Sequence, residues 1–268
     1  MATGPIPRET SLLRRFLNMF SGKAATKPSG GLAVTNILHP AAPFYAVGDL
    51  HGRVDLLEIL LAKLDLSEGQ KVVFLGDYID RGDHSAQTLD CVFQLSQDIP
   101  DQVICLKGNH EKMMCDFIDD PLDRCAIWLR NGGLATLASY GITGASANLS
   151  PNQALDISTA LEAALPAGLL DWVRKLPLSW NSGNIWCVHA AMDPSSLPQV
   201  QHTKTLLWGH RAFLETPRED GICVVHGHTI VDAPVNMNSR IAIDTGAYRS
   251  GRLTAAEIAD GTCDFITT

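Results

Sequence analysis

The sequence lacks several features that would assign it to a familiar class at once. None of its seven cysteines forms a Cys-x-x-Cys pair with another, so a zinc site built from thiolates is poorly supported. No apolar run approaches the roughly 20 residues that a transmembrane helix needs. The N-terminus also has no compact apolar stretch of the kind found in secretory signal peptides. We therefore expect a cytoplasmic protein with reduced cysteines.

Basic residues are also scarce. Lys and Arg number 21 against 29 Asp and Glu, which gives a formal net charge of −8. Because nucleic acid is captured by a basic face, this balance argues against a nucleic-acid partner. Apolar residues make up 46% of the 268-residue chain, which is enough for a large buried core and argues against global disorder.

The first 42 residues differ from the rest of the chain. Apolar residues within 12–20 fall on one helical stripe, and 21–31 is rich in Ser, Gly, Lys and Pro. We predict an amphipathic segment and linker at 1–42, followed by one domain at 43–268. A basic amphipathic helix can contact a membrane surface or a partner. Docking on the same chain, or fraying, is commoner, and we expect no stable membrane insertion.

From residue 43 onward, short apolar runs alternate with helical patterns. This alternation predicts βαβ units with parallel strand pairing. The stretch at about 119–176 is alanine-rich and more continuously helical in pattern. The expected strands cover 44–47, 72–75, 103–106, 185–188, 222–225 and 241–243, and the expected helices that separate the first of them cover 54–64, 85–95 and 111–117.

Polar residues of the metal-ligand type follow the expected strands where each strand ends. Three strands lead into Gly-Asp-Leu-His at 48–51, Gly-Asp at 76–77 and Gly-Asn-His at 108–110, and two later strands end at His189 and in His-Gly-His at 226–228. The carboxyl ends of neighbouring strands in α/β sheets converge on one crevice. A single Gly-Asp turn or a lone strand histidine is usually structural. Five such positions in one chain favour a shared metal site.

The mixture of carboxylate, amide and imidazole groups indicates the kind of metal. Calcium takes oxygen ligands only, whereas Mn, Fe and Zn accept nitrogen as well. Two such ions about 3.5–4 Å apart can share one carboxylate, hold a phosphate and lower the pKa of a bridging water. The sequence therefore predicts a two-metal phosphoesterase.

The motifs match a known family. Gly-Asp-x-His-Gly at 48–52, Gly-Asp-x-x-Asp-Arg-Gly at 76–82 and Gly-Asn-His-Glu at 108–111 together resemble the phosphoprotein phosphatase branch of the calcineurin-like metallophosphoesterases. Compact bacterial and phage serine/threonine phosphatases are the most similar, and the resemblance covers residues 43–258. It implies a single-domain α/β fold (α+β): a β-sandwich of two mixed sheets flanked by helices, with a dinuclear metal site at the strand carboxyl ends.

The resemblance also implies a set of metal ligands. Two residues would bind the first ion, one would bridge both ions and three would complete the second. In that order they are Asp49 and His51, then Asp77, then Asn109, His189 and His228. We read His226, which stands where relatives often carry an apolar residue, as structural.

Other residues would act on the phosphate. By the resemblance, His110 would protonate the leaving oxygen, and Asp80 would orient it and keep it protonated. Arg81 would grip the phosphate oxygens, which Asn109 would also touch. Relatives place a second basic phosphate ligand in a Trp-x-Arg segment.

The sequence leaves two questions open: which residue is the second phosphate ligand, and whether Arg53 reaches the site. The segment that corresponds to Trp-x-Arg reads Leu-Trp-Gly-His-Arg at 207–211, so either His210 or Arg211 would supply the second phosphate ligand. Arg53 is close enough in sequence to reach the site, but it would equally suit the surface.

We predict from these residues a serine/threonine phosphoprotein phosphatase that hydrolyses phosphomonoesters through direct attack by a hydroxide bridging two divalent ions. Manganese is the expected metal, with Fe or Zn as alternatives, and a phosphorylated protein or peptide is the expected partner. The Asp-Arg-Gly at 80–82 favours this prediction over a dinucleoside polyphosphate (diadenosine tetraphosphate) hydrolase, which relatives build on the same ligand set. A non-catalytic phosphoprotein-binding or scaffold protein is the third alternative, which the complete ligand set disfavours.

Overall fold

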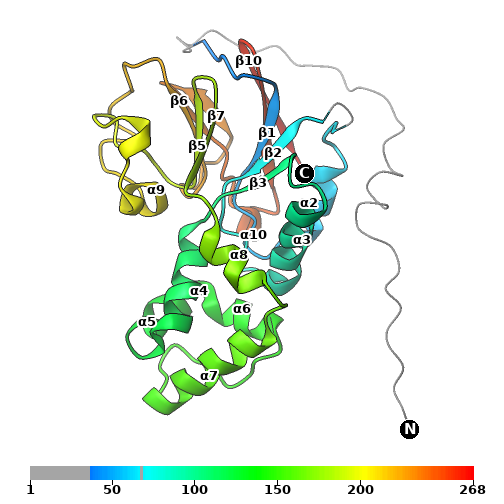
Figure 1. Ribbon diagram of the computed structural model, residues 1–268, viewed down its shortest axis with the longest axis vertical. Helices are drawn as coiled ribbons and strands as arrows, with labels where there is room; N and C mark the ends of the chain where they lie inside the picture. Colours follow the sequence, from blue (N-terminus) through cyan, green and yellow to red (C-terminus); the bar gives the residue numbers. More distant parts are fainter. Residues whose placement is uncertain (1–36, 67–68) are drawn as a thin grey trace.

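The computed structural model describes residues 37–66 and 69–268. Two five-stranded sheets form one end of the molecule, and helices α4 to α8 form the other (Figure 1). The amphipathic segment predicted within 12–20 and its linker lie outside the described residues. Within the described part, no helix combines the length and apolar character needed to cross a bilayer.

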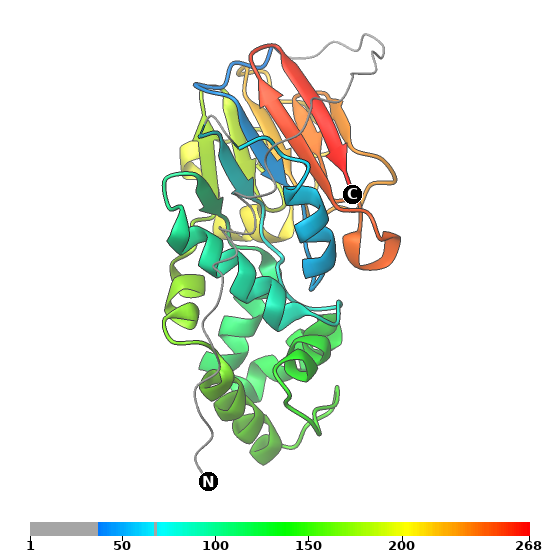
Figure 2. The same cartoon turned by 90° about the vertical axis from the view of Figure 1, so that its right-hand side faces the viewer.

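The two sheets lie against each other (Figure 2). In spatial order, sheet A contains β10 (Thr262–Thr267), β9 (Thr254–Ala259), β1 (Phe44–Val47), β2 (Lys71–Phe74) and β3 (Val103–Cys105). Sheet B contains, in its own spatial order, β4 (Ser179–Ser182), β5 (Ile185–Val188), β6 (Cys223–His226), β8 (Arg240–Ala242) and β7 (Val235–Met237). The expected sandwich of two mixed sheets flanked by helices is confirmed.

The six strands expected from the sequence form the parallel parts of both sheets. β1 pairs with β2 and β2 with β3, and likewise β5 with β6 and β6 with β8. Four antiparallel strands, β4, β7, β9 and β10, were not predicted. Their sequences are rich in Ala, Thr, Ser and Asn and lack the short run of large apolar residues that marks a strand buried on both faces.

The side chains of β1 alternate between two layers, as the period of a strand requires. Phe44 and Ala46 pack between the sheets against the inner face of sheet B. Tyr45 and Val47 point the other way and pack with the leucines of α2 (Val54–Leu61). The outer face of sheet B is covered in the same manner by Leu206 of α9 (Thr203–Trp208). Three apolar layers therefore hold the two sheets in a fixed relation.

The remaining helices cover sheet A and extend below it. Within this helical part, Phe117 and Trp128 stack with ring centroids 5.0 Å apart. The segment Leu129–Gly133 joins two of its helices across a kink at Gly132, whose φ of 114° is not helical. The remaining helices are α3 (Ser85–Asp98), α4 (Asn109–Asp119), α5 (Pro121–Trp128), α6 (Leu134–Ser139), α7 (Pro151–Ala164), α8 (Leu169–Lys175) and the short α10 (Ala247–Ser250).

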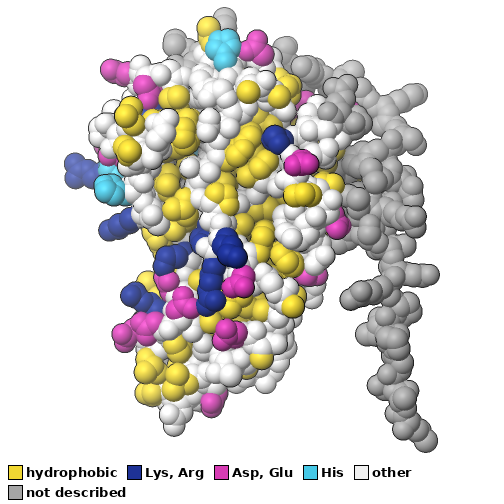
Figure 3. All heavy atoms as spheres, viewed as in Figure 1, with side chains coloured by type: hydrophobic (Ala, Val, Ile, Leu, Met, Phe, Trp, Pro, Cys, Tyr) yellow, Lys and Arg dark blue, Asp and Glu magenta, His cyan; other side chains and the backbone are white. Residues whose placement is uncertain are grey.

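Basic side chains gather midway down the face in Figure 3, over the region of α4 and α8, with acidic side chains among them. Two ion pairs on these helices are Arg174 with Asp119 at 2.6 Å and Lys112 with Asp116. The charge of this face is therefore mixed. All seven cysteines lie in the described part of the chain, where none is bonded to another.

Candidate active site

The expected ligand residues meet where the carboxyl ends of strands from both sheets come together. Asp49, Asp77 and Asn109 follow β1, β2 and β3 of sheet A, and His189 and His228 follow β5 and β6 of sheet B. The main-chain N–H of His228 donates to the Asp49 carboxylate at 3.1 Å, which joins the two sheets at the site. Of these five residues, all but His228 are buried.

Within the described residues, two overlapping groups of side chains have the spacing of metal ligands. His51, Asp77 and His110 form one group, and Asp77, His189 and His228 form the other, each with ligand atoms within 4.8 Å of one another. One Asp77 oxygen lies 3.5 Å from His51 Nε2 and the other lies 3.4 Å from His189 Nε2. A carboxylate shared by two ions would need such a position between two ligand groups, and the bridging role of Asp77 stays a prediction.

Hydrogen bonds fix the tautomers of two histidines. His51 Nδ1 donates to the carbonyl of Ile79 at 2.8 Å, and His189 Nδ1 donates to the carbonyl of Leu75 at 3.0 Å. In each neutral ring this leaves a lone pair on Nε2, which is the arrangement that metal-binding histidines use. Burial lowers the pKa of His51 to about 3 and also lowers that of His189, so both rings are neutral at pH 7.

The donor atoms around Asn109 fit a cation. Asn109 Oδ1 lies 2.8 Å from His189 Nε2 and 2.9 Å from His228 Nδ1. Since His189 carries its proton on Nδ1, the lone pairs of its Nε2 and of the Asn109 oxygen face each other. Both atoms would be ligands to a cation placed between them, and its charge would offset that repulsion. The mixed nitrogen and oxygen donors suit divalent transition-metal ions.

Three buried carboxylates add to the demand for positive charge. Burial, together with the charges of Asp244 and Asp77, raises the pKa of Asp49 well above its usual range. Burial also raises the pKa of Asp244 to about 6. Divalent ions would offset this crowding. The sequence offered a signal for Asp244, because an Asp-Thr-Gly segment follows β8 as the other ligand segments follow their strands.

His110 and Asp80 form a buried pair beside the metal ligands. His110 Nδ1 lies 2.6 Å from Asp80 Oδ2. Burial lowers the pKa of His110, but the carboxylates of Asp77 and Asp80 outweigh it, so the pKa lies above its ordinary value. The Nε2 atom on the opposite side of the ring lies 3.8 Å from Asp77 Oδ2. A proton on Nε2 would therefore point at the reaction centre.

Two residues that the sequence did not assign to the site hold Asp80. Trp128 Nε1 donates to Asp80 Oδ2 at 3.0 Å, and Thr136 Oγ1 donates to Asp80 Oδ1 at 2.6 Å. They belong to α5 and α6, so the helical part of the molecule orients the His110 and Asp80 pair. Trp128 and Thr136 lie 48 and 56 positions from Asp80, so no local motif links them to it.

Arg81 lies over the two histidines of the first group. Its Nη1 lies 3.1 Å from His51 Nε2, and its Nη2 lies 3.1 Å from His110 Nε2. Arg81 has φ of 69°. Its main-chain N–H donates to the carbonyl of Gly132 at 3.3 Å, and a Cβ on Gly132 would lie 2.8 Å from the Arg81 nitrogen. Glycine at 132 thus permits the approach that aims Arg81 at the centre.

A left-handed backbone recurs throughout the site. Such conformations cost a non-glycine residue about 1–3 kcal/mol each and persist only where the surroundings enforce them. The residues concerned are His51 (φ 42°), Asp77 (53°), Asp80 (71°), Arg81 (69°) and His228 (61°). Backbone strain is therefore concentrated at the residues whose side chains would do the chemistry.

Glu111 fixes this backbone at Asp77. Its buried carboxylate accepts the main-chain N–H groups of Asp77 at 2.9 Å, Tyr78 at 2.8 Å and Gly108 at 2.9 Å. These bonds tie the loop after β2 to the loop after β3. Glu111 lies in the Gly-Asn-His-Glu motif, but no role was predicted for it from that motif.

Replacing Glu111 with Gln should weaken metal binding. An amide would turn one acceptor oxygen into a donor that faces main-chain N–H groups, so the Asp77 loop would shift. Loss of such supporting contacts typically costs about 10–100-fold in metal affinity or activity. Metal titration followed by calorimetry measures the change. The exposed Glu58→Gln change is the matched control, and equal affinity in both variants would contradict a supporting role for Glu111.

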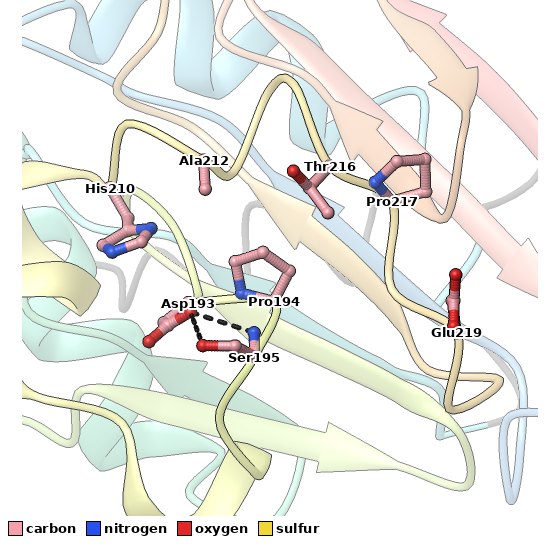
Figure 4. Close-up of a pocket in the computed structure, with 8 residues that line it drawn as sticks. All are labelled: Asp193, Pro194, Ser195, His210, Ala212, Thr216, Pro217 and Glu219. Atoms are coloured by element: carbon pink, nitrogen blue, oxygen red, sulfur yellow. Dashed lines mark hydrogen bonds between the residues drawn. The ribbon is translucent and has the colours of Figure 1, made fainter.

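The two candidates for the second phosphate ligand lie apart from this set of contacts. His210 lines a pocket of about 530 Å³ together with Asp193, Pro194 and Thr216 (Figure 4). Arg211 is exposed. In the described part of the chain, no hydrogen bond or ion pair connects either residue to the metal ligands. Their role in phosphate binding stays a prediction.

His226 is buried beside the site but belongs to neither metal-ligand group. Its Nδ1 donates to the carbonyl of Gly227 at 3.0 Å, and its ring packs edge-on against Phe213 at 4.9 Å between centroids. These contacts place His226 between sheet B and the segment that carries Phe213.

Comparison with known proteins gives the site its context. The sequence profile of the calcineurin-like phosphoesterases matches residues 42–253. The serine/threonine-protein phosphatase 6 catalytic subunit of Caenorhabditis elegans is 35% identical over 91 residues, which cover 34% of this chain and 27% of that protein. The symmetrical bis(5′-nucleosyl)-tetraphosphatase of Janthinobacterium sp. (strain Marseille) is 28% identical over 265 residues, covering 81% of this chain and 93% of that protein.

Solved structures with this architecture are described under different activities. One described as a diadenosine tetraphosphatase has a TM-score of 0.60 at 16% identity, covering 85% of this chain and 94% of its own. A cold-active protein-tyrosine phosphatase of a psychrophilic Shewanella has a TM-score of 0.52 at 19% identity. The match covers 86% of this chain and 83% of that one. A protein serine/threonine phosphatase of Saccharomyces cerevisiae has a TM-score of 0.53 at 14% identity. The match covers 87% of this chain and 83% of that one. At these identities the similarity establishes the fold alone.

Proposed function

The chain belongs to the calcineurin-like phosphoesterase family, and from that premise we propose that it hydrolyses dinucleoside polyphosphates such as diadenosine tetraphosphate. The observation that carries this proposal is the alignment with the Janthinobacterium tetraphosphatase, which extends over 93% of that protein. The phosphatase 6 subunit is matched over 27% of its length, so this chain spans about a quarter of it. The dinucleoside polyphosphate is therefore our first candidate substrate and the phosphoprotein our second, which reverses the order predicted from the motifs.

Divalent metal ions would be held by the six clustered ligands Asp49, His51, Asp77, Asn109, His189 and His228. When bound, they would place positive charge at the phosphate oxygens and lower the pKa of water at the centre. We propose manganese, with iron or zinc as alternatives, because the donor set accepts all three.

The protein's own groups would bind the phosphate and move the proton. Arg81 offers two N–H groups toward the centre, which matches the paired oxygens of a phosphate. His110 would donate its Nε2 proton to the leaving oxygen, while Asp80 holds the other ring nitrogen.

A second candidate, a serine/threonine phosphoprotein phosphatase, is favoured by the buried His110 and Asp80 pair. The leaving group of a phosphoserine or phosphothreonine is an alkoxide, which needs a proton at neutral pH. The leaving group of a dinucleoside polyphosphate is a nucleotide phosphate, which is stable as an anion. A phosphorylated protein would then be the partner.

One experiment separates the candidates. The purified protein, loaded with Mn²⁺, is incubated with diadenosine tetraphosphate and, in parallel, with a phosphoserine peptide. We expect ADP as the nucleotide product and a higher kcat/KM for the dinucleotide. A higher kcat/KM for the peptide would overturn this order in favour of the phosphoprotein phosphatase. Absence of turnover after loading with Mn²⁺, Fe²⁺ or Zn²⁺ would support a non-catalytic binding protein.

A further inference from the structure

The guanidinium of Arg81 needs a support that remains when the site is loaded. Its two hydrogen bonds go to His51 Nε2 and His110 Nε2. A metal ligated by His51 takes the first of these lone pairs, and a proton on His110 removes the second. Arg81 is exposed, and in the described residues it makes no ion pair with a carboxylate. Something other than these two hydrogen bonds must then hold it over the centre.

The ring of Tyr248 contacts both Arg81 and the metal-ligand group. Arg81 Cζ lies 5.0 Å from the Tyr248 ring centroid, which is within the range of a cation–π interaction. The same ring meets His51 edge-on, with centroids 5.4 Å apart and planes at 83°. A cation–π contact takes up none of the guanidinium's N–H groups as hydrogen-bond donors, so those groups stay available to a phosphate.

Tyr248 is itself held in place by the chain around α10. Arg53 Nη1 donates to the carbonyl of Ala247 at 2.9 Å, and Asp55 holds the other side of the Arg53 guanidinium with bonds of 2.8 and 2.6 Å. The Gly246 N–H donates to a carboxylate oxygen of Asp244 at 2.9 Å. Arg53, which the sequence left open, thus fixes the helix that carries Tyr248.

We propose that Tyr248 is a positioning residue that holds the Arg81 guanidinium over the metal centre in the orientation that receives a phosphate. The proposal rests on the phosphate-binding role proposed for Arg81, and it does not depend on which substrate is natural. It assigns a function to a half-buried tyrosine that contacts the site only through a charged neighbour and a ligand ring.

A double-mutant cycle tests the proposal on the full, Mn²⁺-loaded chain. The variants are Tyr248→Leu, Tyr248→Phe, Arg81→Ala and the double Tyr248→Leu/Arg81→Ala. An exposed cation–π contact predicts that Tyr248→Leu raises both the KM for p-nitrophenyl phosphate and the calorimetric Kd for inorganic phosphate by about two- to fivefold. We expect Tyr248→Phe, which keeps the ring, to match the parent. In the Arg81→Ala background the Tyr248→Leu change should have no further effect.

Three outcomes would overturn the proposal. Tyr248→Leu could raise KM and Kd equally with and without Arg81, it could raise them in neither background, or Tyr248→Phe could bind phosphate as weakly as Tyr248→Leu. Metal content measured for each variant separates a positioning effect from loss of the ions. If Tyr248→Leu does not fold, Tyr248→Gln keeps a side chain of similar reach without the ring. Because p-nitrophenyl phosphate is neither of the two proposed natural substrates, the two tests are independent. The role of Tyr248 can fail while the proposed function holds, and the proposed function can fail while the role of Tyr248 holds.

Discussion

Replacing Asp77 with Asn should abolish hydrolysis of every substrate. Its two carboxylate oxygens face the two ligand groups separately, so a neutral amide would lose one ligand oxygen and place an NH₂ against a histidine lone pair. Metal ions contribute several kcal/mol of charge stabilisation, and each 1.36 kcal/mol is tenfold in rate. We therefore expect kcat to fall by about a thousandfold or more.

Two measurements check this expectation. The rate with p-nitrophenyl phosphate gives the loss of turnover, and elemental analysis of the purified variant gives the metal bound per chain, which should fall. Asp83→Asn, six positions along and exposed, is the matched control and should retain both. An Asp77→Asn variant with full metal content and parental turnover would exclude Asp77 as the shared ligand.

Replacing His110 with Asn should slow some substrates far more than others. General acid catalysis contributes about 10²–10⁴-fold where the leaving group needs a proton. We expect a loss of that size with phosphoserine peptide, whose leaving group is an alkoxide. We expect a much smaller loss with p-nitrophenyl phosphate or a dinucleoside polyphosphate, whose leaving groups are stable anions. Parallel kcat/KM measurements on the three substrates give the comparison.

The same variant also decides between two roles for His110. Its distance to Asp77 would allow metal ligation, but its bond to Asp80 and its raised pKa favour proton donation. Metal content should therefore stay at the parental level. Equal losses on all three substrates would contradict the acid role, and loss of metal would make His110 a ligand. Asp80→Asn should change the same substrates in the same direction.

The buried strands were readable from the sequence because each is a short apolar run that ends in a ligand motif. β1 and β5 have the bounds expected, and the other four parallel strands differ by one residue at one or both ends. The antiparallel strands were missed for a physical reason. β10, for example, is only partly buried, so its sequence carries no continuous apolar signal.

The site was predictable to the extent that local motifs carry it. The ligand types and their strand-end positions were in the sequence. Their supports were not, because those contacts join distant segments: Thr136 reaches Asp80 across 56 positions, and Trp128 reaches it across 48. The choice of substrate was equally beyond the motifs, since the alignment that favours dinucleotides extends over most of the chain.

The hydrogen bond from His228 to Asp49 spans 179 positions, and it has a consequence for how the protein is made. Loops of sheet A supply four of the six predicted metal ligands and loops of sheet B supply the other two, so a chain emerging from the ribosome carries no complete set until the segment after β6 has been synthesised. Proteins dominated by contacts between residues far apart in the sequence fold slowly. We therefore expect binding of metal by the complete ligand set to follow the docking of the two sheets.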